Sequence, residues 1–518
     1  MDSRNIKVII ISILAVFAAL YLGITAATAQ LETIALVVGT ATFVTCLLLG
    51  RRIWLLIPFL GALAFTFRLP SLPTSLLIAQ FLFIGFSALL ILMRKLPFRI
   101  HFTELEFWTI LIIAFVFQVY IRNPTGISLF GGATVGGKAY IIFAITVVTS
   151  GLLYGLRVPF QELKLILRLS IWGGVLNFIF FLIGFFFPGI GMWYGAASGF
   201  DTGTANIEGY RSSRVGFLGT ASKNLSLWVC AFISPLRALG RPFWLFLIII
   251  SLGFAAASGY RNNVAAVGLT FILGLIYRGG LTHIFAAIML SIFGVVSLSV
   301  VNLVTPLPPN MQRSLSFIPG TWDVDVVDDT ENSTKWRMEI WKEVLFTDRW
   351  INNKLLGDGL GFTTKELQTQ MALSELKGIT GTSGFDMHRE TILSNADYHS
   401  GPVQTIRTIG YIGLIALLLA MIRLAIHAHC QIQRCRDTEW FPLALFVGIP
   451  LIWGPIFFVF IFGSFTTGTT AFLMGAAMIR MLENNLPLPA YVAKRYRVYH
   501  PLALRNTALN RQGALSNQ

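Results

Sequence analysis

Residues 323–349 read DVDVVDDTENSTKWRMEIWKEVLFTDR, a charged stretch in a chain whose other parts are mostly apolar. The segment from Thr305 to Gly401 holds 14 of the 24 acidic residues of the chain and nine of its 39 Lys and Arg residues. Over all 518 residues, 55% are hydrophobic and only 12% are charged, about half the charged share of an ordinary soluble domain. These features predict a polytopic membrane protein with one large, water-exposed loop.

Apolar runs outside this loop are long enough to cross a bilayer, which takes about 20 residues in a helix. Fourteen runs meet this expectation: 6–28, 32–50, 53–68, 74–93, 105–121, 139–156, 168–188, 216–236, 242–258, 264–278, 281–303, 402–423, 440–462 and 465–482. The first run does not end in a cleavage site of small residues, so we expect a retained anchor. The predicted fold class is an all-α polytopic membrane protein with about 14 transmembrane helices and one large helical loop on the outer, periplasmic face.

Lys and Arg residues gather between alternate apolar runs, as at Arg51–Arg52, Arg94–Lys95, Arg423–Arg436 and Lys494–Arg511. Cytoplasmic loops are enriched in Lys and Arg, so both termini are predicted to be cytoplasmic. The formal net charge of +15 is not gathered in a basic patch with interleaved aromatic residues, which argues against a nucleic-acid partner. The predicted parts are an N-terminal transmembrane bundle (1–303), the outer loop (304–401), C-terminal transmembrane helices (402–482) and a basic cytoplasmic tail (483–518).

The outer loop is predicted to be ordered. Asn332 and Ser333 are expected to cap an amphipathic helix that suits the headgroup region. Its apolar face is formed, at helical spacing, by Trp336, Ile340, Trp341, Val344 and Leu345. Thr363 and Glu366 have the spacing of a capping box for a second helix. Gly357–Gly361 (GDGLG) lacks the Lys and Ser/Thr of a nucleotide-binding loop, so a tight turn is the favoured interpretation.

His427, His429, Cys430 and Cys435 lie close together in the sequence after one of the predicted spans. Their spacing fits no standard structural zinc site, and a basic turn beside the membrane is the favoured interpretation. No metal or other cofactor is predicted. No two of the four Cys residues are expected on the outer face, so packing must hold the outer loop together.

Three polar clusters are expected at the outer surface. Arg211 and Arg214 precede one span, Arg261 lies in the short corner Ser258–Asn263 between two others, and His399 comes just before Pro402 at the start of a fourth. Proline suits the first turn of a helix, so His399 is predicted at the positive end of a helix. That position favours a neutral imidazole, which can accept a proton.

Each cluster also has an interpretation without chemistry. Arg214 or Arg261 can extend to lipid headgroups, although an outward Arg261 runs against the positive-inside tendency. Arg407 lies inside a span, where charge is expensive and usually functional, but it can also pair with a carboxylate and hold helices together. His399 alone can be an ordinary loop residue.

Together these residues resemble the O-antigen ligase and O-antigen polymerase superfamily of bacterial envelope glycosyltransferases. The resemblance covers about 211–415 and rests on Arg214-x-x-x-Leu218, Ser258-Gly-Tyr-Arg261, Ser333-Thr-Lys-Trp-Arg337-Met-Glu-Ile-Trp341, Leu356-Gly-Asp-Gly-Leu-Gly361 and His399-Ser400 followed by Ile409-Gly410-Tyr-Ile-Gly413. It implies a glycosyltransferase type C-like fold in the bacterial plasma (inner) membrane. It also implies metal-independent transfer of a glycan from a polyprenyl (undecaprenyl) pyrophosphate carrier to an acceptor hydroxyl at the outer face.

The implied reaction assigns roles to the outer-face residues. Arg214 and Arg261 would clamp the pyrophosphate, because Arg is the preferred bidentate partner of phosphate. His399 would orient or deprotonate the acceptor hydroxyl, and these three are the candidate catalytic residues. The candidate substrate-binding residues are Arg211, Arg313, Arg337, Tyr398, Gln404 and Arg407. The family commonly has Asn after the His, where this chain has Ser400, so the role of that position is open.

A flippase or other transporter of lipid-linked oligosaccharide is the alternative from a different class. Transporters tend to show internal repeats and polar groups at mid-membrane, whereas this chain shows no repeat and its polar candidates gather at one surface. A non-catalytic scaffold for envelope-polysaccharide assembly is a third possibility. The acceptor can be a glycan or a lipid core. A glycan acceptor would make the protein a polymerase, and a lipid-core acceptor would make it a ligase.

Overall fold

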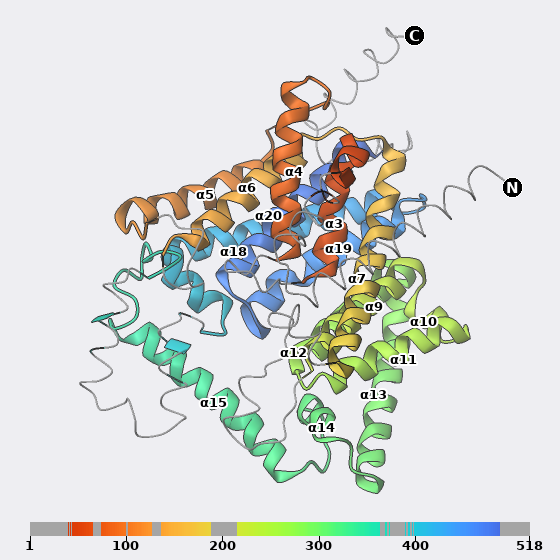
Figure 1. The fold of residues 1–518 in the computed structure, drawn as a ribbon. Coiled ribbons are helices and arrows are strands. Elements are labelled where there is room, and N and C mark those ends of the chain that lie inside the picture. The colour runs from red at the N-terminus through yellow and green to blue at the C-terminus, as the bar shows by residue number, and fades with distance from the viewer. Residues whose placement is uncertain are drawn as a thin grey trace, which may run out of the picture. The chain divides into compact units, whose positions relative to one another are not determined.

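The computed structural model describes residues 40, 42, 44–65, 74–99, 102–126, 136–187, 215–362, 368–369, 372, 389, 392–393, 396 and 398–486. Every named element in these residues is a helix (Figure 1), in agreement with the predicted all-α class. The elements are η1 (Gly50–Leu55), α3 (Leu56–Leu63), α4 (Ser75–Leu92), α5 (Glu104–Arg122), α6 (Lys138–Gly155), η2 (Phe160–Leu163), α7 (Lys164–Phe186), α9 (Gly216–Phe232), α10 (Pro235–Ala238), α11 (Pro242–Ala257), α12 (Arg261–Gly279), α13 (Leu281–Val304), α14 (Pro309–Leu315), α15 (Val324–Phe346), α18 (Gly401–Cys435), α19 (Phe441–Ile456), η3 (Phe457–Ile461) and α20 (Phe465–Asn485).

Eight of the described helical stretches are long and apolar enough to cross a bilayer, as expected for a multi-pass membrane protein. They are Val44–Leu63, Ser75–Leu92, Glu104–Arg122, Lys138–Gly155, Phe160–Phe186, Thr282–Val304, Gly401–Cys435 and Phe441–Ile461. The prediction of about 14 spans is therefore not met by the described part of the chain. The runs 32–50 and 53–68 are represented by the single stretch Val44–Leu63, and 6–28 lies outside the described residues.

Four predicted runs form helices that are too short or too polar to count as spans. Helices α9 and α11 have 17 and 16 residues, fewer than the roughly 20 that a span needs. Helix α12 begins with Arg261-Asn-Asn and ends near Arg278, and α20 carries Arg480 and Glu483. These polar groups lower the mean hydropathy of both helices, although each also contains a long apolar run.

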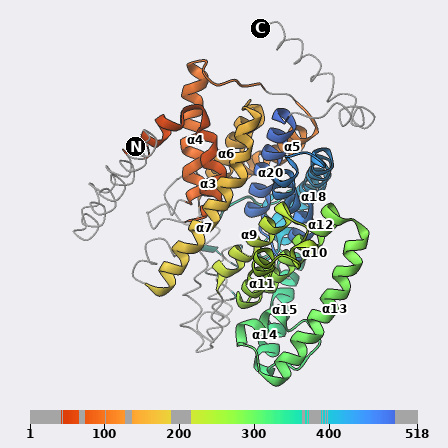
Figure 2. The same ribbon diagram turned by 90° about the vertical axis from the view of Figure 1, so that its right-hand side faces the viewer.

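The chain divides into two compact units, Met1–Trp54 with Leu82–Leu96 and Leu55–Phe81 with Pro97–Gln518. All functional candidates belong to the second unit. In it, α18 packs against α5, α15, α19 and α20, while α9 packs against α7, α11, α12 and α19. No residue of α9 from Val215 to Ala231 is exposed. Helix α13 lies at the edge of this unit (Figure 2), and most of its side chains are exposed.

The apolar face predicted in the outer loop is present, but its helix begins earlier than predicted, and the face packs against a protein core. Helix α15 starts at Val324 because the carboxylate of Asp323 accepts the backbone N–H of Asp325, so Asn332 and Ser333 lie inside the helix and do not cap it. Ile340 and Val344 are fully buried in a protein core with Trp350, Tyr398 and Val403. Ile340 and Val344 therefore pack against protein, and Trp336, Trp341 and Leu345 are partly buried against the same core. The predicted Thr363–Glu366 capping box lies outside the described residues.

Helix α18 is broken at Gly410, whose φ of 76° lies in the left-handed region that glycine tolerates. The carbonyls of Arg407 and Thr408, which would normally accept helical bonds from residues 411 and 412, accept the N–H groups of Asp358 and Gly359 instead, at 2.7 and 3.1 Å. The N–H of Tyr411 donates to the Lys354 carbonyl at 2.9 Å. We call Lys354–Gly361 the docking loop.

The docking loop is a tight turn, as its glycines predict. Gly357 and Gly359 have φ of 81° and 114°, and a Cβ atom at Gly357 would overlap the Thr408 carbonyl. The Asp358 carboxylate accepts the backbone N–H groups of Asn352 and Asn353 at 2.7 and 3.0 Å. From α5, Arg122 donates to the carbonyls of residues 356 and 357. The turn therefore joins α5 to the break in α18.

Cysteine labelling tests the predicted orientation. In a variant without the four native Cys residues, Asp348→Cys should react with an impermeant maleimide from outside, because its side chain is 90% exposed in the loop region. Glu439→Cys, at a site 59% exposed after α18, should react only after the membrane is permeabilised. The reverse pattern would contradict the placement of the loop at the outer face.

Candidate functional site

His399 precedes α18 in a backbone conformation that few residues adopt. Its φ is +50°, in the left-handed region, where His is one of the more tolerated side chains. The ring lies between two aromatic rings, with centroids 6.2 Å from Trp336 of α15 and 6.0 Å from Phe462, which follows η3. The next residue, Ser400, is the N-cap of α18, and its hydroxyl accepts the backbone N–H of Val403. Ser400 thus stabilises the start of α18 directly after His399.

Tyr398 belongs to the protein core under this site. It is 1% exposed, and its carbonyl accepts the Trp341 indole N–H at 2.7 Å. Burial raises the pKa of Tyr398 to about 12, so the phenol is protonated at neutral pH. A side chain this deep fixes the position of the neighbouring His399 and offers little surface to a substrate.

Gln404 and Arg407, two predicted substrate contacts, bind protein groups. The Gln404 amide donates to the Ala396 carbonyl and accepts the Phe465 N–H, both at 2.8 Å. Arg407 is 2% exposed, lies over the Phe362 ring at 4.1 Å, and donates to the carbonyls of Gly359 and Gly361. No carboxylate pairs with Arg407 among the ion pairs of the described residues. Both side chains therefore position the docking loop and the helix ends around His399.

Arg261 is the first residue of α12, and its guanidinium donates to the Ser316 hydroxyl at 3.3 Å. Ser316 directly follows α14, which carries the buried Arg313. Two cations therefore come from elements that touch, since α12 packs on α14. The N-terminus of a helix and a guanidinium at its first residue both favour an anion.

The start of α9 lies against the same corner. The Val215 N–H donates to the Ser258 carbonyl at 3.1 Å, and a Cβ atom at Gly219 would overlap the side-chain amide of Asn263. Val215 follows directly after Arg214 in the sequence. Arg211 and Arg214 themselves lie outside the described residues. Val215, the residue after Arg214, is the one that contacts the corner.

The predicted residues fall into two groups that share one neighbour. Arg261 and Arg313 lie on α12 and α14, whereas His399 precedes α18 and Arg337 lies on α15, next to the Trp336 that contacts His399. Helix η3 packs on both α12 and α18. The two groups are therefore linked through η3.

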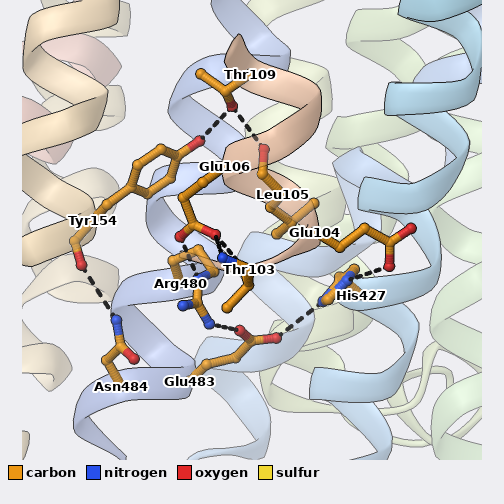
Figure 3. Close-up of polar contacts among 10 residues, drawn as sticks. All are labelled: Thr103, Glu104, Leu105, Glu106, Thr109, Tyr154, His427, Arg480, Glu483 and Asn484. Atoms are coloured by element: carbon orange, nitrogen blue, oxygen red, sulfur yellow. Dashed lines mark hydrogen bonds and ion pairs between the residues drawn. The ribbon is translucent and has the colours of Figure 1, made fainter. Parts of the chain in front are cut away.

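A second charged site, which the sequence analysis did not identify, joins the opposite end of α18 to α5 and α20 (Figure 3). Arg480 donates to Glu106 at 2.8 Å and to Glu483 at 2.6 Å. The His427 ring lies between two carboxylates, 3.2 Å from Glu483 and 3.7 Å from Glu104. We call these five residues the charge cluster. The available sequence signal was Arg480 inside the predicted span 465–482, with Glu483 at i+3 just after its end.

The charge cluster is expected to stabilise the helix bundle. Arg480 and Glu106 are 7% and 6% exposed, and removing one partner of a buried ion pair costs about 3–5 kcal/mol because the other charge stays buried and unpaired. Arg480→Met should therefore lower the unfolding temperature of the purified protein strongly. Adding Glu106→Gln to that variant should recover part of the loss.

The matched control is Arg423→Met. Arg423 pairs with Glu104 at 3.2 Å, but the two side chains are 51% and 40% exposed, and exposed pairs contribute at most about 1 kcal/mol. Equal losses of thermal stability in Arg480→Met and Arg423→Met would contradict a buried stabilising role.

The His and Cys residues once considered for zinc have other partners. His427 belongs to the charge cluster, and His429 Nδ1 lies 2.6 Å from the Tyr277 hydroxyl. Within the described ranges, no group of three or more His, Cys, Asp and Glu residues has the arrangement of a metal site.

The sequence was also compared with known proteins. It matches no model of a known protein family and no curated protein.

Proposed function

We propose that this protein transfers a glycan from a polyprenyl pyrophosphate carrier to an acceptor hydroxyl at the outer face of the bacterial plasma membrane, as an O-antigen ligase or polymerase does. The observation that carries the proposal is the backbone of His399, held at φ +50° at the start of α18 between Trp336 and Phe462. Strained backbone persists where surrounding structure over-determines it, commonly at functional sites. Here Ser400, Tyr398 and Gln404 all fix the chain around that one ring.

In the proposed reaction the acceptor oxygen attacks the anomeric carbon of the carrier-linked sugar. The proton of the acceptor hydroxyl passes to the His399 imidazole, and the bond between the anomeric carbon and the phosphate oxygen breaks. The lipid pyrophosphate leaves with the bonding electron pair. Arg261, with Arg214 as a second cation, stabilises the negative charge that develops on this leaving group.

The different surroundings of the nearby side chains support the proposal. Arg407 and Gln404 donate to backbone carbonyls, and the Tyr398 ring packs in the protein core, so these three side chains hold the site in place. His399 and Arg261 stand at helix starts, and both side chains are partly exposed. Arg313 and Arg337 remain candidate contacts for the pyrophosphate or the sugar.

Purified protein in proteoliposomes should convert a radiolabelled, undecaprenyl pyrophosphate-linked glycan into a longer glycan or a glycosylated lipid core, and release the lipid pyrophosphate. The product size distinguishes a polymerase from a ligase. Transbilayer movement of the donor without any new glycosidic bond would identify a flippase and contradict the proposal.

A further inference from the structure

Lys223 is a cation in the middle of the most enclosed helix of the second unit. Helix α9 has no exposed residue from Val215 to Ala231, and Lys223 itself is half-buried. No hydrogen bond or ion pair of its ammonium group occurs among the described residues. A charge inside a membrane protein is expensive and usually functional, so this lysine calls for a counter-charge.

The surrounding helices do not supply that counter-charge. Helix α9 packs on α7, α11, α12 and α19, and none of these five helices contains an Asp or Glu residue. The other charged side chains on them are cations near helix ends, Lys164, Arg168, Arg261 and Arg278. These five helices therefore offer no carboxylate partner to Lys223.

Helical spacing directs Lys223 to the gap between α12 and α19. Gly219 and Cys230, one turn before and two turns after Lys223, both contact α12, so Lys223 shares their face. Ser222 meets α11, and Phe217 stacks on Phe181 of α7. The face of α9 that packs on α19 therefore lies next to the face that packs on α12, and Lys223 lies between these two faces.

Trp453 of α19 brings a second donor to this gap. Its indole N–H is buried and has no hydrogen-bond partner among the described residues. On α19, Gly448 contacts α18 and Leu451 contacts α20. Trp453 lies on the opposite side of α19 from both residues by helical spacing. Its indole therefore faces the side of α19 where α9, α12 and α7 pack. By helical spacing, an ammonium and an N–H donor, neither with an acceptor among the described residues, thus face the same junction of helices.

We propose that Lys223 and Trp453 form an oxyanion site between α9, α12 and α19 that takes a phosphate or pyrophosphate group. Lys223 lies eight residues from the Val215 N–H that bonds the Ser258 corner, roughly 12 Å along the helix. Side chains lean toward the N-terminus of their helix, so the ammonium extends back toward that corner and Arg261. The ligand class rests on the proposed function, since Lys is a common phosphate binder; the site itself rests on the unpaired donors.

Ligand-induced thermal stabilisation tests the site without any glycan acceptor. Purified wild-type protein, titrated with inorganic pyrophosphate and separately with a short-chain polyprenyl pyrophosphate, should be stabilised by at least one probe. Lys223→Met should weaken that binding about tenfold or more, as expected for a lost charged hydrogen bond. Trp453→Phe, which removes only the N–H, should weaken it several-fold. Stabilisation by the lipid alone identifies a carrier headgroup, and stabilisation by the inorganic anion alone identifies a free phosphate site.

The matched control is Lys335→Met, which removes a lysine that is 69% exposed and paired with Glu331; it should bind both probes as the wild type does. If Lys223→Met fails to fold, Lys223→Gln and Trp453→Phe decide, because each removes the charge or the N–H with little change in packing. Wild-type affinity in Lys223→Met, or in both of those milder variants, would overturn the site. Lys223-dependent binding without glycan transfer would instead overturn only the proposed function.

Discussion

Replacing His399 with Asn is expected to lower the rate of glycan transfer by about a hundred- to ten-thousandfold, the contribution typical of general acid–base catalysis. Asn tolerates the left-handed φ of His399 and keeps a hydrogen-bonding side chain, but it cannot take up the acceptor proton. Binding of the lipid-linked donor should change little, because that binding is assigned to the Arg residues. Initial rates and donor affinity should be measured separately on the purified variant.

His283→Asn is the matched control, because His283 lies on α13 and its ring contacts only the Gly279 carbonyl of the preceding helix among its described hydrogen bonds. It should keep the wild-type rate. Transfer by the wild type should also fall in acid, since a protonated imidazole cannot act as a base. If His399→Asn loses donor binding but turns over bound donor normally, His399 is a phosphate contact and the base must be sought elsewhere.

Arg261→Ala is expected to reduce transfer by about a hundred- to a thousandfold, the loss seen when one preorganised donor to a developing anion is removed. Arg261→Lys should recover only part of the rate, because a point charge lacks the bidentate fork of the guanidinium. The protein level and unfolding temperature should stay near those of the wild type, since Arg261 lies at the first residue of α12 and its hydrogen bond to the Ser316 hydroxyl is long, at 3.3 Å.

Arg241→Ala provides the comparison for this residue. Arg241 is exposed at the start of α11, so its loss removes the same side chain from a surface position and should leave transfer unchanged. Full activity in Arg261→Ala would return Arg261 to an ordinary contact with lipid headgroups and remove the main cation from the proposed clamp.

Local patterns allowed part of this structure to be predicted. The spacing of Ile340 and Val344 predicted the apolar face of α15, and Pro402 predicted the start of α18. The true start of α15 was missed because Asp323 caps it and the acidic residues after it, read as loop, are favourable in the first turns of a helix. Features with a period of one helical turn are encoded locally and can be read from the sequence.

The contacts between distant segments could not be predicted in this way. Arg480 and Glu106 are 374 residues apart in the chain, and neither neighbourhood specifies the other. The same holds for Arg407, predicted as a substrate contact inside a span, whose partners are the carbonyls of Gly359 and Gly361. Sequence spacing identified that Arg407 needs partners, but only the fold determines which groups they are.

The break in α18 has a consequence for biosynthesis. In hydrocarbon, each unsatisfied backbone group costs several kcal/mol, and at Gly410 the missing helical bonds are replaced by bonds to Asp358, Gly359 and Lys354. The half of α18 that begins at Gly401 therefore cannot settle in the bilayer as an independent helix. It must enter together with the docking loop, already secured to Arg122 of α5. The ribosome makes α5 first, the docking loop next and α18 last, so the order of synthesis matches the order in which these pieces can assemble.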